Sequence, residues 1–232
     1  SLYLRLRDRN PATFAAYFDL GDFQVVSASP ERFLRVAAGH VETRPIKGTR
    51  QRTHSPEADL FAGAELCHSD KDRAENVMIV DLLRNDLSRV CTADSVRVSQ
   101  LCCVENYQFV QHLVSAIRGR LAPDCSPVDL IRATFPGGSI TGAPKVRAME
   151  IIAELETSPR RVYTGTVGVI RPNGDAVFNV AIRTLEWRDG VARLAMGAGI
   201  VADSVPDDED LECRNKAAAL LAAIPAARRM TA

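Results

Sequence analysis

The sequence lacks the patterns of histidine and cysteine that usually mark a zinc site. Its four histidines are His40, His54, His68 and His112, which lie far apart, and none of its six cysteines forms a C-x-x-C pair. Zinc sites in proteins draw on clustered cysteine, histidine and carboxylate ligands. The cysteine spacing also gives no disulfide framework, which a chain of 232 residues does not need. We therefore expect reduced thiols and a cytoplasmic protein.

Net charge and long apolar runs are absent too. Lys plus Arg number 29 and Asp plus Glu number 29, so no overall field attracts nucleic acid or an anionic membrane. No apolar run is long enough to span a bilayer, and we find no signal peptide, repeat or low-complexity tract. The chain begins with "SLYLRLRDRN" and no Met, so we expect residues 1–232 to be one domain of a longer chain.

What is present is a series of blocks in the order strands, helices, strands and a final helix, with hairpins between strands. Ser55 followed by Pro56, and Ser69, are typical of helix starts, and Asn173-Gly174 and Asp189-Gly190 favour hairpins. Strands are expected within 21–36, 33–45, 94–104, 111–121, 162–170, 176–188 and 191–202. Helices are expected after Ser55 and over 70–88, 126–135, 144–156 and 206–224. This order predicts an α+β fold, with antiparallel sheets packed as a sandwich and flanked by helices.

The stretch "VETRPIKGTR", residues 41–50, holds a lysine in an unusual setting. Pro45 restricts the backbone on the N-terminal side of Lys47, and Gly48 frees the backbone on its C-terminal side. We therefore expect Lys47 on a short, shaped turn. Arg44, Arg50 and Arg52 add local positive charge that suits a small anionic ligand. The simpler alternative is a solvated loop lysine.

Two helices carry carboxylates that suit a divalent cation. Glu75 has Met78, Ile79 and Leu82 on its face, with Asp72 one turn earlier. A carboxylate on an apolar stripe needs a metal or a partner, and the alternative is a salt bridge to Arg84 or Arg89.

In the last helix, Glu209, Glu212 and Lys216 are spaced to share one face. An exposed Glu212–Lys216 pair is the alternative there. If Glu75 and Glu212 converge, they suit Mg²⁺, which takes one or two carboxylates together with water and an anionic substrate.

The segment "FPGGSITGAPK" offers backbone N–H groups to an anion just before a helix. It is not a P-loop, because the G-x-x-x-x-G-K-[ST] spacing is missing. A plain glycine-rich turn explains the segment equally well. Further anion-binding candidates are Arg183 on one strand, Tyr163 on its neighbour and the backbone of residues 197–199.

Five segments in this order resemble the chorismate-utilising enzymes. They are "PIKGTR", "DRAENVMIVDLLRNDLSRV", "FPGGSITGAPKVRAMEII", "AIRTL" and "GAGIVADS". That family includes anthranilate synthase, aminodeoxychorismate synthase, isochorismate synthase and salicylate synthase. The residue between "PI" and "GT" is usually small in anthranilate and isochorismate synthases, whereas aminodeoxychorismate synthase component I typically has "PIKGT". Within the family, Lys47 thus makes the chain most similar to that component.

The resemblance implies a chemistry for the site. Lys47 would attack ring carbon 2 of chorismate while the 4-hydroxyl leaves, and ammonia would then add at carbon 4 and expel the lysine. Glu31, in "SASPERF", matches the general acid for the departing hydroxyl. His112 matches an active-site histidine. Ammonia would come from a separate glutamine amidotransferase subunit.

The resemblance also implies a metal and a substrate pocket. Glu75 and Glu212 match Mg²⁺ ligands, with Asp72 and Glu209 in their outer shell. The positions that match groups lining the substrate or holding its carboxylates are Gly48, Thr49, Ser139, Tyr163, Arg183, Gly197, Gly199 and Lys216. The sequence departs from the pattern at Ser88, where the family usually has glycine, and lacks the N-terminal part of the usual chain. The alternatives are an anthranilate synthase large component, or a chorismate-binding module without turnover.

Overall fold

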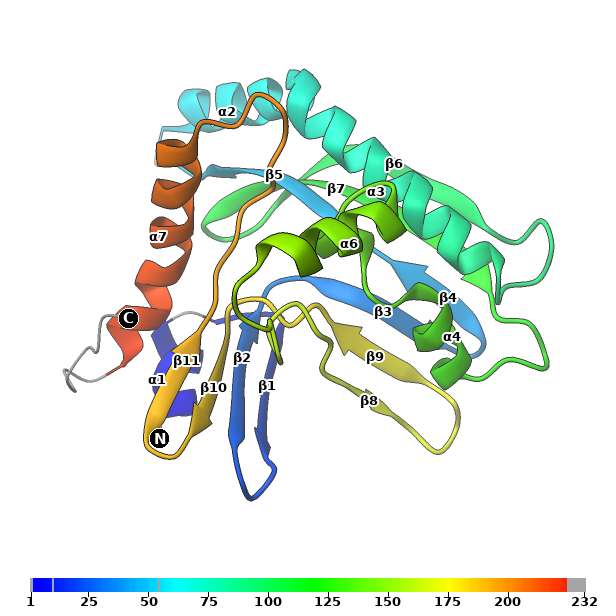
Figure 1. The fold of residues 1–232 in the computed structure, drawn as a ribbon. Coiled ribbons are helices and arrows are strands. Elements are labelled where there is room, and N and C mark those ends of the chain that lie inside the picture. Colours follow the sequence, from blue (N-terminus) through cyan, green and yellow to red (C-terminus); the bar gives the residue numbers. More distant parts are fainter. Residues whose placement is uncertain (1, 10, 54, 225–232) are drawn as a thin grey trace. The chain divides into compact units, whose positions relative to one another are not determined.

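The computed structural model describes residues 2–9, 11–53 and 55–224, apart from the side chain of residue 219. These residues form two compact units (Figure 1). Unit 1 comprises Ser1–Glu31, Ser158–Val167 and Asn179–Ala232, and unit 2 comprises Arg32–Thr157 and Gly168–Phe178. One of the four histidines, His54, lies outside the described residues.

Unit 1 is a four-stranded antiparallel sheet with two helices. The strands follow the order β1 (Phe14–Asp19), β2 (Gln24–Ser29), β10 (Thr184–Arg188) and β11 (Val191–Leu194). Helices α1 (Leu2–Arg9) and α7 (Pro206–Ala223) contribute Leu6, Leu220 and Ala223 to a core with Val26, Ala28 and Leu185 of the sheet. Burial of these apolar side chains is what holds the helices to the strands.

Unit 2 is built on a larger sheet around one long strand. The order is β5 (Ile46–Gln51), β7 (Val110–Arg120), β4 (His40–Thr43), β3 (Arg32–Ala37), β9 (Ala176–Asn179) and β8 (Gly168–Ile170), with β6 (Arg97–Asn106) also paired to β7. Strand β7 pairs with β6 along one edge and with β5 and β4 in turn along the other. The residues of β7 therefore bring three other strands into register.

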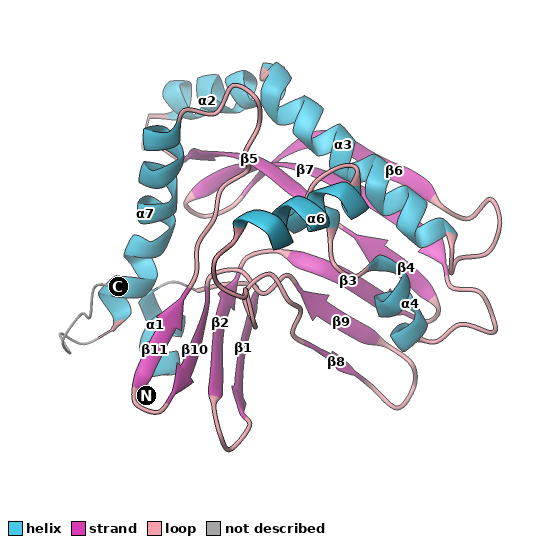
Figure 2. Ribbon diagram, viewed as in Figure 1, coloured by secondary structure: helices cyan, strands magenta, loops and turns pink. Residues whose placement is uncertain are grey.

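The helices of unit 2 flank this sheet (Figure 2). They are α2 (Pro56–His68), α3 (Asp70–Ser88), α4 (Pro127–Thr134), α5 (Gly138–Thr141) and α6 (Lys145–Leu155). As predicted, Ser55 and Ser69 cap α2 and α3 by accepting hydrogen bonds from Ala58 and Asp72. Helices α2 and α3 pack on β5, β6 and β7.

The predicted class is confirmed, since antiparallel sheets with flanking helices make up the described chain. The hairpins at Asn173-Gly174 and Asp189-Gly190 are also confirmed. Three long strand predictions were wrong in extent. Residues 162–164 lie in a turn, 176–188 divide into β9 and β10 of different sheets, and β11 stops at Leu194. The two hairpins were predictable because Asn173-Gly174 and Asp189-Gly190 form their turns from neighbouring residues. The division of residues 176–188 depends instead on which strands they pair with, and some of those strands lie far away in the sequence.

Candidate functional site

Lys47 lies in strand β5 and not on a turn, which corrects the sequence prediction. It pairs with Leu113 of β7, and the register then shifts, so that Thr49 pairs with His112. The extra residue in this bulge is Gly48, whose φ of +75° is the left-handed conformation that glycine adopts freely. Gly48, which was predicted to free the backbone after Lys47, therefore forms a β-bulge in strand β5.

Gly48 is also a point of close approach between the strand and two helices. A Cβ atom there would lie 2.6 Å from Leu66 Cδ1 of α2 and 2.9 Å from Asp72 Cγ of α3. Both distances are shorter than real Cβ contacts allow, so with a side chain at this position Leu66, Asp72 or the strand itself would have to shift. The absence of a side chain lets Asp72 and its neighbours on α3 approach the backbone next to Lys47.

The positive charges around Lys47 are matched by carboxylates. Arg44 pairs with Glu105, Arg50 with Glu65 and Asp72, and Arg52 with Asp59. Lys47 Nζ itself lies 3.9 Å from Glu75 Oε2, and each of these two side chains is 19% exposed. The alternative of a salt bridge from Glu75 to Arg84 or Arg89 is wrong, because Arg84 pairs with Asp81 and Arg89 with Asp86. Unit 2 thus brings Lys47, Glu75 and Asp72 together.

A second pair of predicted residues meets on the same two strands. Thr49 Oγ1 and His112 Nδ1 are 2.9 Å apart and share a hydrogen bond. The ring of Tyr107 meets the ring of His112 edge-on at a centroid distance of 5.3 Å. These contacts hold the imidazole in a defined orientation beside the bulge.

Ser139 lies in α5, the short helix inside the glycine-rich segment that was predicted to be a loop. The two preceding glycines are places of close packing. A Cβ on Gly137 would be 3.1 Å from Phe33 Cε2, and one on Gly138 would be 2.9 Å from Leu82 Cδ1. The glycines therefore let this segment pack tightly on β3 and α3.

Unit 1 brings four other predicted residues together. Lys216 Nζ of α7 donates a hydrogen bond to Gly197 O at 3.2 Å and lies 2.5 Å from Glu212 Oε1. A Cβ on Gly197 would be 2.6 Å from Tyr163 Oη, so the glycine admits the phenol. The Glu212–Lys216 pair considered as an alternative is thus present. Gly199 lies two residues further on and is exposed.

Arg183 precedes β10 and was wrongly predicted to lie within a strand. Its φ is +49°, which is uncommon for a residue with a side chain, and its carbonyl accepts a hydrogen bond from Ala28 N at 3.0 Å. Burial lowers the pKa of the Arg183 guanidinium, while the neighbouring negative charge of Glu31 acts in the opposite direction. A half-buried arginine next to an acid, with a backbone in the left-handed region, is a candidate for a functional role.

The carboxylates proposed for Mg²⁺ have a suitable chemistry, because magnesium prefers oxygen ligands. Glu209 Oε1 accepts from Ser204 at 2.7 Å, whereas Glu209 Oε2 is buried with no hydrogen-bond partner. Such an orphaned oxygen fits the outer shell of a cation site. Among the described residues, no group of three or more His, Cys, Asp or Glu is placed to hold a metal ion by itself. A metal would therefore depend on water or substrate oxygens as well.

Sequence reasoning missed Asn76, which is completely buried on α3 directly after Glu75. The buried face of α3 includes Asn76, Ile79, Val80 and Leu83, so it is centred on the asparagine and not on Glu75. The signal was available, since apolar residues follow Asn76 at i+3, i+4 and i+7. A polar side chain in that position must find partners inside the protein.

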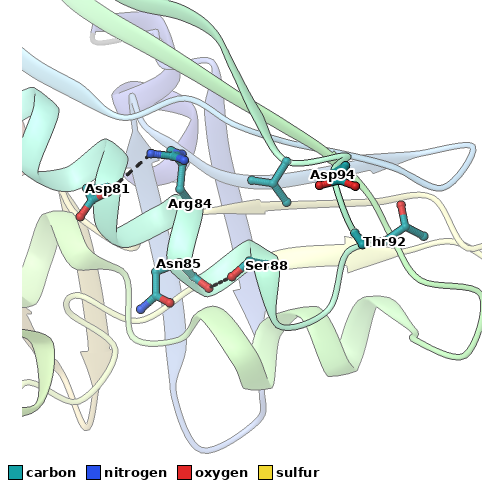
Figure 3. A pocket seen from close by; sticks show the side chains of 8 residues that line it. Asp81, Arg84, Asn85, Ser88, Thr92 and Asp94 are labelled. Carbon is teal, nitrogen blue, oxygen red and sulfur yellow. Dashed lines mark hydrogen bonds and ion pairs between the residues drawn. The ribbon is translucent and has the colours of Figure 1, made fainter.

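A surface cavity of about 400 Å³ lies elsewhere on unit 2, at the C-terminal end of α3 (Figure 3). Asp81, Arg84, Asn85 and Ser88 line it, together with residues 92–94 and Val96. Ser88 is the residue that stands where the family pattern usually has glycine. Its hydroxyl has a hydrogen-bond partner, because Ser88 Oγ donates to Asn85 O at 2.7 Å. None of the predicted site residues lines this cavity.

The chain belongs to the family of chorismate binding enzymes, whose pattern matches residues 1–222. It is 47% identical over 223 residues to aminodeoxychorismate synthase component 1 of Bacillus subtilis, covering 96% of this chain and 47% of that protein. It is 45% identical over 224 residues to anthranilate synthase component 1 of Aquifex aeolicus, covering 97% and 45%.

A solved structure supports the same family. Anthranilate synthase component I from Streptococcus pneumoniae matches with a TM-score of 0.86 and 40% identity, over 94% of this chain and 48% of that one. The chain thus spans about half the length of the curated relatives it matches. No helix among the described residues is long and apolar enough to cross a membrane.

Proposed function

We propose that the chain is the chorismate-binding part of an aminodeoxychorismate synthase component I. It would aminate chorismate to 4-amino-4-deoxychorismate on the route to p-aminobenzoate and folate. One observation carries the proposal: Lys47, the lysine of "PIKGT", is held next to the Gly48 bulge with its amine 3.9 Å from Glu75. The similarity to proteins of that name in several organisms supports it.

Lys47 is proposed to act as the nucleophile. Its neutral amine would form a bond to ring carbon 2 while the bond from carbon 4 to the hydroxyl breaks. Glu31 would give its proton to the departing oxygen, so that water leaves. Ammonia would then bond to carbon 4 and expel the lysine nitrogen from carbon 2. The overall balance is chorismate plus ammonia giving 4-amino-4-deoxychorismate plus water.

The remaining residues are proposed to hold the substrate. Arg183 and Lys216 carry positive charge for carboxylates, and Tyr163 adds a hydroxyl donor. Gly197 and Gly199 leave the backbone accessible, and Gly48, Thr49 and Ser139 would line the ring. His112 would be oriented by Thr49, with which it shares a hydrogen bond.

Mg²⁺ is proposed as the cofactor, with Glu75 and Glu212 as ligands and Asp72 and Glu209 behind them. When bound, the ion would neutralise a substrate carboxylate. Chorismate, ammonia and a glutamine amidotransferase subunit that supplies the ammonia are the proposed partners, with no role for nucleic acid or membrane. We propose that the reaction takes place in the cytoplasm, where the free cysteines would stay reduced.

Intact-protein mass spectrometry tests the nucleophile. The protein is mixed with chorismate and Mg²⁺ in the absence of ammonia and quenched rapidly in acid. We expect a chorismate-derived adduct that peptide mapping assigns to Lys47. Lys47→Ala should abolish the adduct, whereas Lys71→Ala, at an exposed lysine of α3, should retain it. An adduct that persists in Lys47→Ala would refute the assignment.

The second candidate is the large component of anthranilate synthase, because relatives of that name are nearly as similar. Product analysis with ammonium salt separates the two, since anthranilate formation does not need the Lys47 amine and should survive Lys47→Ala. A third candidate is a binding module without turnover, which predicts chorismate binding in a calorimeter but no product at high ammonium concentration.

A further inference from the structure

Asn76 makes a hydrogen-bond network inside unit 2 that ties α3 to the central strand. Its Nδ2 donates to Leu113 O at 3.3 Å, and its Oδ1 accepts a hydrogen bond from Ser115 Oγ. Asn76 and Ser115 are both fully buried. Cys102 N of β6 donates to Ser115 Oγ at 2.8 Å. One side chain of α3 is thereby fixed to β7 and, through Ser115, to β6.

The same network reaches the strand that carries Lys47. Leu113, whose carbonyl accepts from Asn76, is the residue that pairs with Lys47 across the sheet. The N–H group of Ser115 donates to Pro45 O at 3.2 Å, two residues before Lys47. On the helix, Glu75 immediately precedes Asn76. The network therefore fixes the backbone on both sides of the contact between Lys47 and Glu75.

We propose that Asn76 is a positioning residue that sets the separation between Lys47 and Glu75. Asn76 is hydrogen-bonded to Leu113 of β7, the residue that pairs with Lys47. Because Glu75 is the neighbour of Asn76 on α3, these bonds hold the Glu75 carboxylate at a fixed distance from the Lys47 amine. The consequence for turnover rests on the proposed function, whereas the effect on geometry does not. Asn76 touches neither substrate nor reacting atoms in this assignment.

Packing alone does not account for an asparagine here. Leucine has the same number of side-chain heavy atoms and the same branch point as asparagine and would bury apolar surface against Leu113, whereas a buried carboxamide must be desolvated and then satisfied. The two hydrogen bonds between Asn76 and β7, with Leu113 and Ser115, are directional and fix the position of α3 along that strand more strictly than apolar contacts would. A small displacement would change the contact at 3.9 Å between Lys47 and Glu75.

Three variants test the inference. Asn76→Leu removes all the hydrogen bonds of the carboxamide, including the one from Cys102 Sγ at 3.7 Å, and keeps the branched shape of the side chain. Ser115→Ala removes the hydrogen bond to Asn76 Oδ1 together with the acceptor of Cys102 N, leaves the bond from Asn76 to Leu113 in place, and serves if Asn76→Leu does not fold. Val80→Ala is the matched control, because Val80 lies on the same buried face of α3 and has no polar side chain. Urea denaturation of each variant records the general loss of stability, so that effects on the site can be compared at known stability.

The first measurement needs no enzymatic activity. Competitive labelling with acetic anhydride at one pH, read out by mass spectrometry, gives the reactivity of Lys47 relative to Lys71 in the same molecule. Glu75→Gln defines the change expected when the contact is lost. We expect Asn76→Leu to move Lys47 reactivity toward that of Glu75→Gln, by about threefold. Val80→Ala should leave it unchanged.

The second measurement is turnover with chorismate, Mg²⁺ and ammonium salt. We expect Asn76→Leu to lower kcat about tenfold or more with little change in the KM for chorismate, because the reacting groups are displaced while the substrate contacts remain. Val80→Ala should keep the native kcat. If Asn76→Leu and Ser115→Ala match Val80→Ala in labelling, the positioning role is wrong. If native protein gives no product but labelling changes as expected, the proposed function fails and the positioning role stands.

Discussion

The Asp86 carboxylate near the end of α3 accepts a hydrogen bond from Lys145 Nζ at the start of α6. Only 2% of the Asp86 side chain and 15% of the Lys145 side chain are exposed. Lys145 Nζ also donates to Thr134 O at 3.1 Å, and Arg89 donates to Asp86 at 2.9 Å. These contacts fix both ends of the segment between Thr134 and Lys145, which contains Ser139.

Asp86→Ala should lower the free energy of unfolding by about 3 kcal/mol, because it leaves the Lys145 ammonium buried without its counter-charge. Asp81→Ala, on the same helix, removes an ion pair in which the Asp81 side chain is 82% exposed. Its cost should be about 0.5 kcal/mol or less. Urea denaturation measures both. Equal costs for the two variants would contradict the importance of the buried pair.

Gly48→Ala should destabilise the protein more than Gly39→Ala. Both glycines have a φ near +75°, but a Cβ on Gly39 has nothing within 4 Å, whereas one on Gly48 would meet Leu66 and Asp72. Gly39→Ala should cost about 1 kcal/mol for the backbone conformation. Gly48→Ala should cost about 2 kcal/mol or more, because overpacking is added. Thermal and urea unfolding compare them, and equal losses would show that α2 and α3 yield freely.

Glu42→Gln should weaken the dependence of stability on pH in acid. Burial raises the pKa of the Glu42 carboxyl, but Arg118 and Arg32 outweigh that effect, so the pKa lies below its usual value of 4.5. Because the folded state binds this proton less readily than the unfolded state, Glu42 stabilises the fold above pH 4.5. That contribution is lost as pH falls through the folded pKa.

Urea unfolding at a series of pH values from 7 downward measures this effect. The native protein should lose stability more steeply below pH 4.5 than Glu42→Gln does. Arg118→Met should give an intermediate slope, because one of the two arginines remains. Parallel curves for native protein and Glu42→Gln would contradict the prediction.

Cys91 should resist alkylation in the folded protein. Burial raises the pKa of its thiol to about 11, and the neighbouring Cys125 adds to the shift. Little thiolate then exists at pH 8, and the sulfur is covered. Iodoacetamide labelling with peptide mapping should modify exposed Cys103 first and Cys91 only after denaturation. Early modification of Cys91 would argue against its burial.

Removal of either proposed magnesium ligand should weaken Mg²⁺ binding. Glu75→Gln and Glu212→Gln should each reduce Mg²⁺ affinity, measured calorimetrically with chorismate present, by at least about tenfold. Glu154→Gln provides the control, because Glu154 is an exposed carboxylate on α6. Unchanged affinity in both site variants would remove these residues as ligands.

The sequence by itself determined the features whose causes are local. Ser55 and Ser69 cap their helices through the next turn, and Asn173-Gly174 and Asp189-Gly190 form hairpins within a few residues. The "PIKGT" segment likewise indicated the lysine and the backbone freedom at Gly48, because both are written in neighbouring residues.

The tertiary structure decided what depends on residues far along the chain. Glu75 lies by Lys47 and not by an arginine of its own helix, and residues 176–188 divide between two sheets. Asn76 finds its partners 37 and 39 residues away, on β7. A helix periodicity tells which residues are buried, but it does not say which strand covers them. That choice is made by packing and by hydrogen bonds formed only when the sheet is assembled.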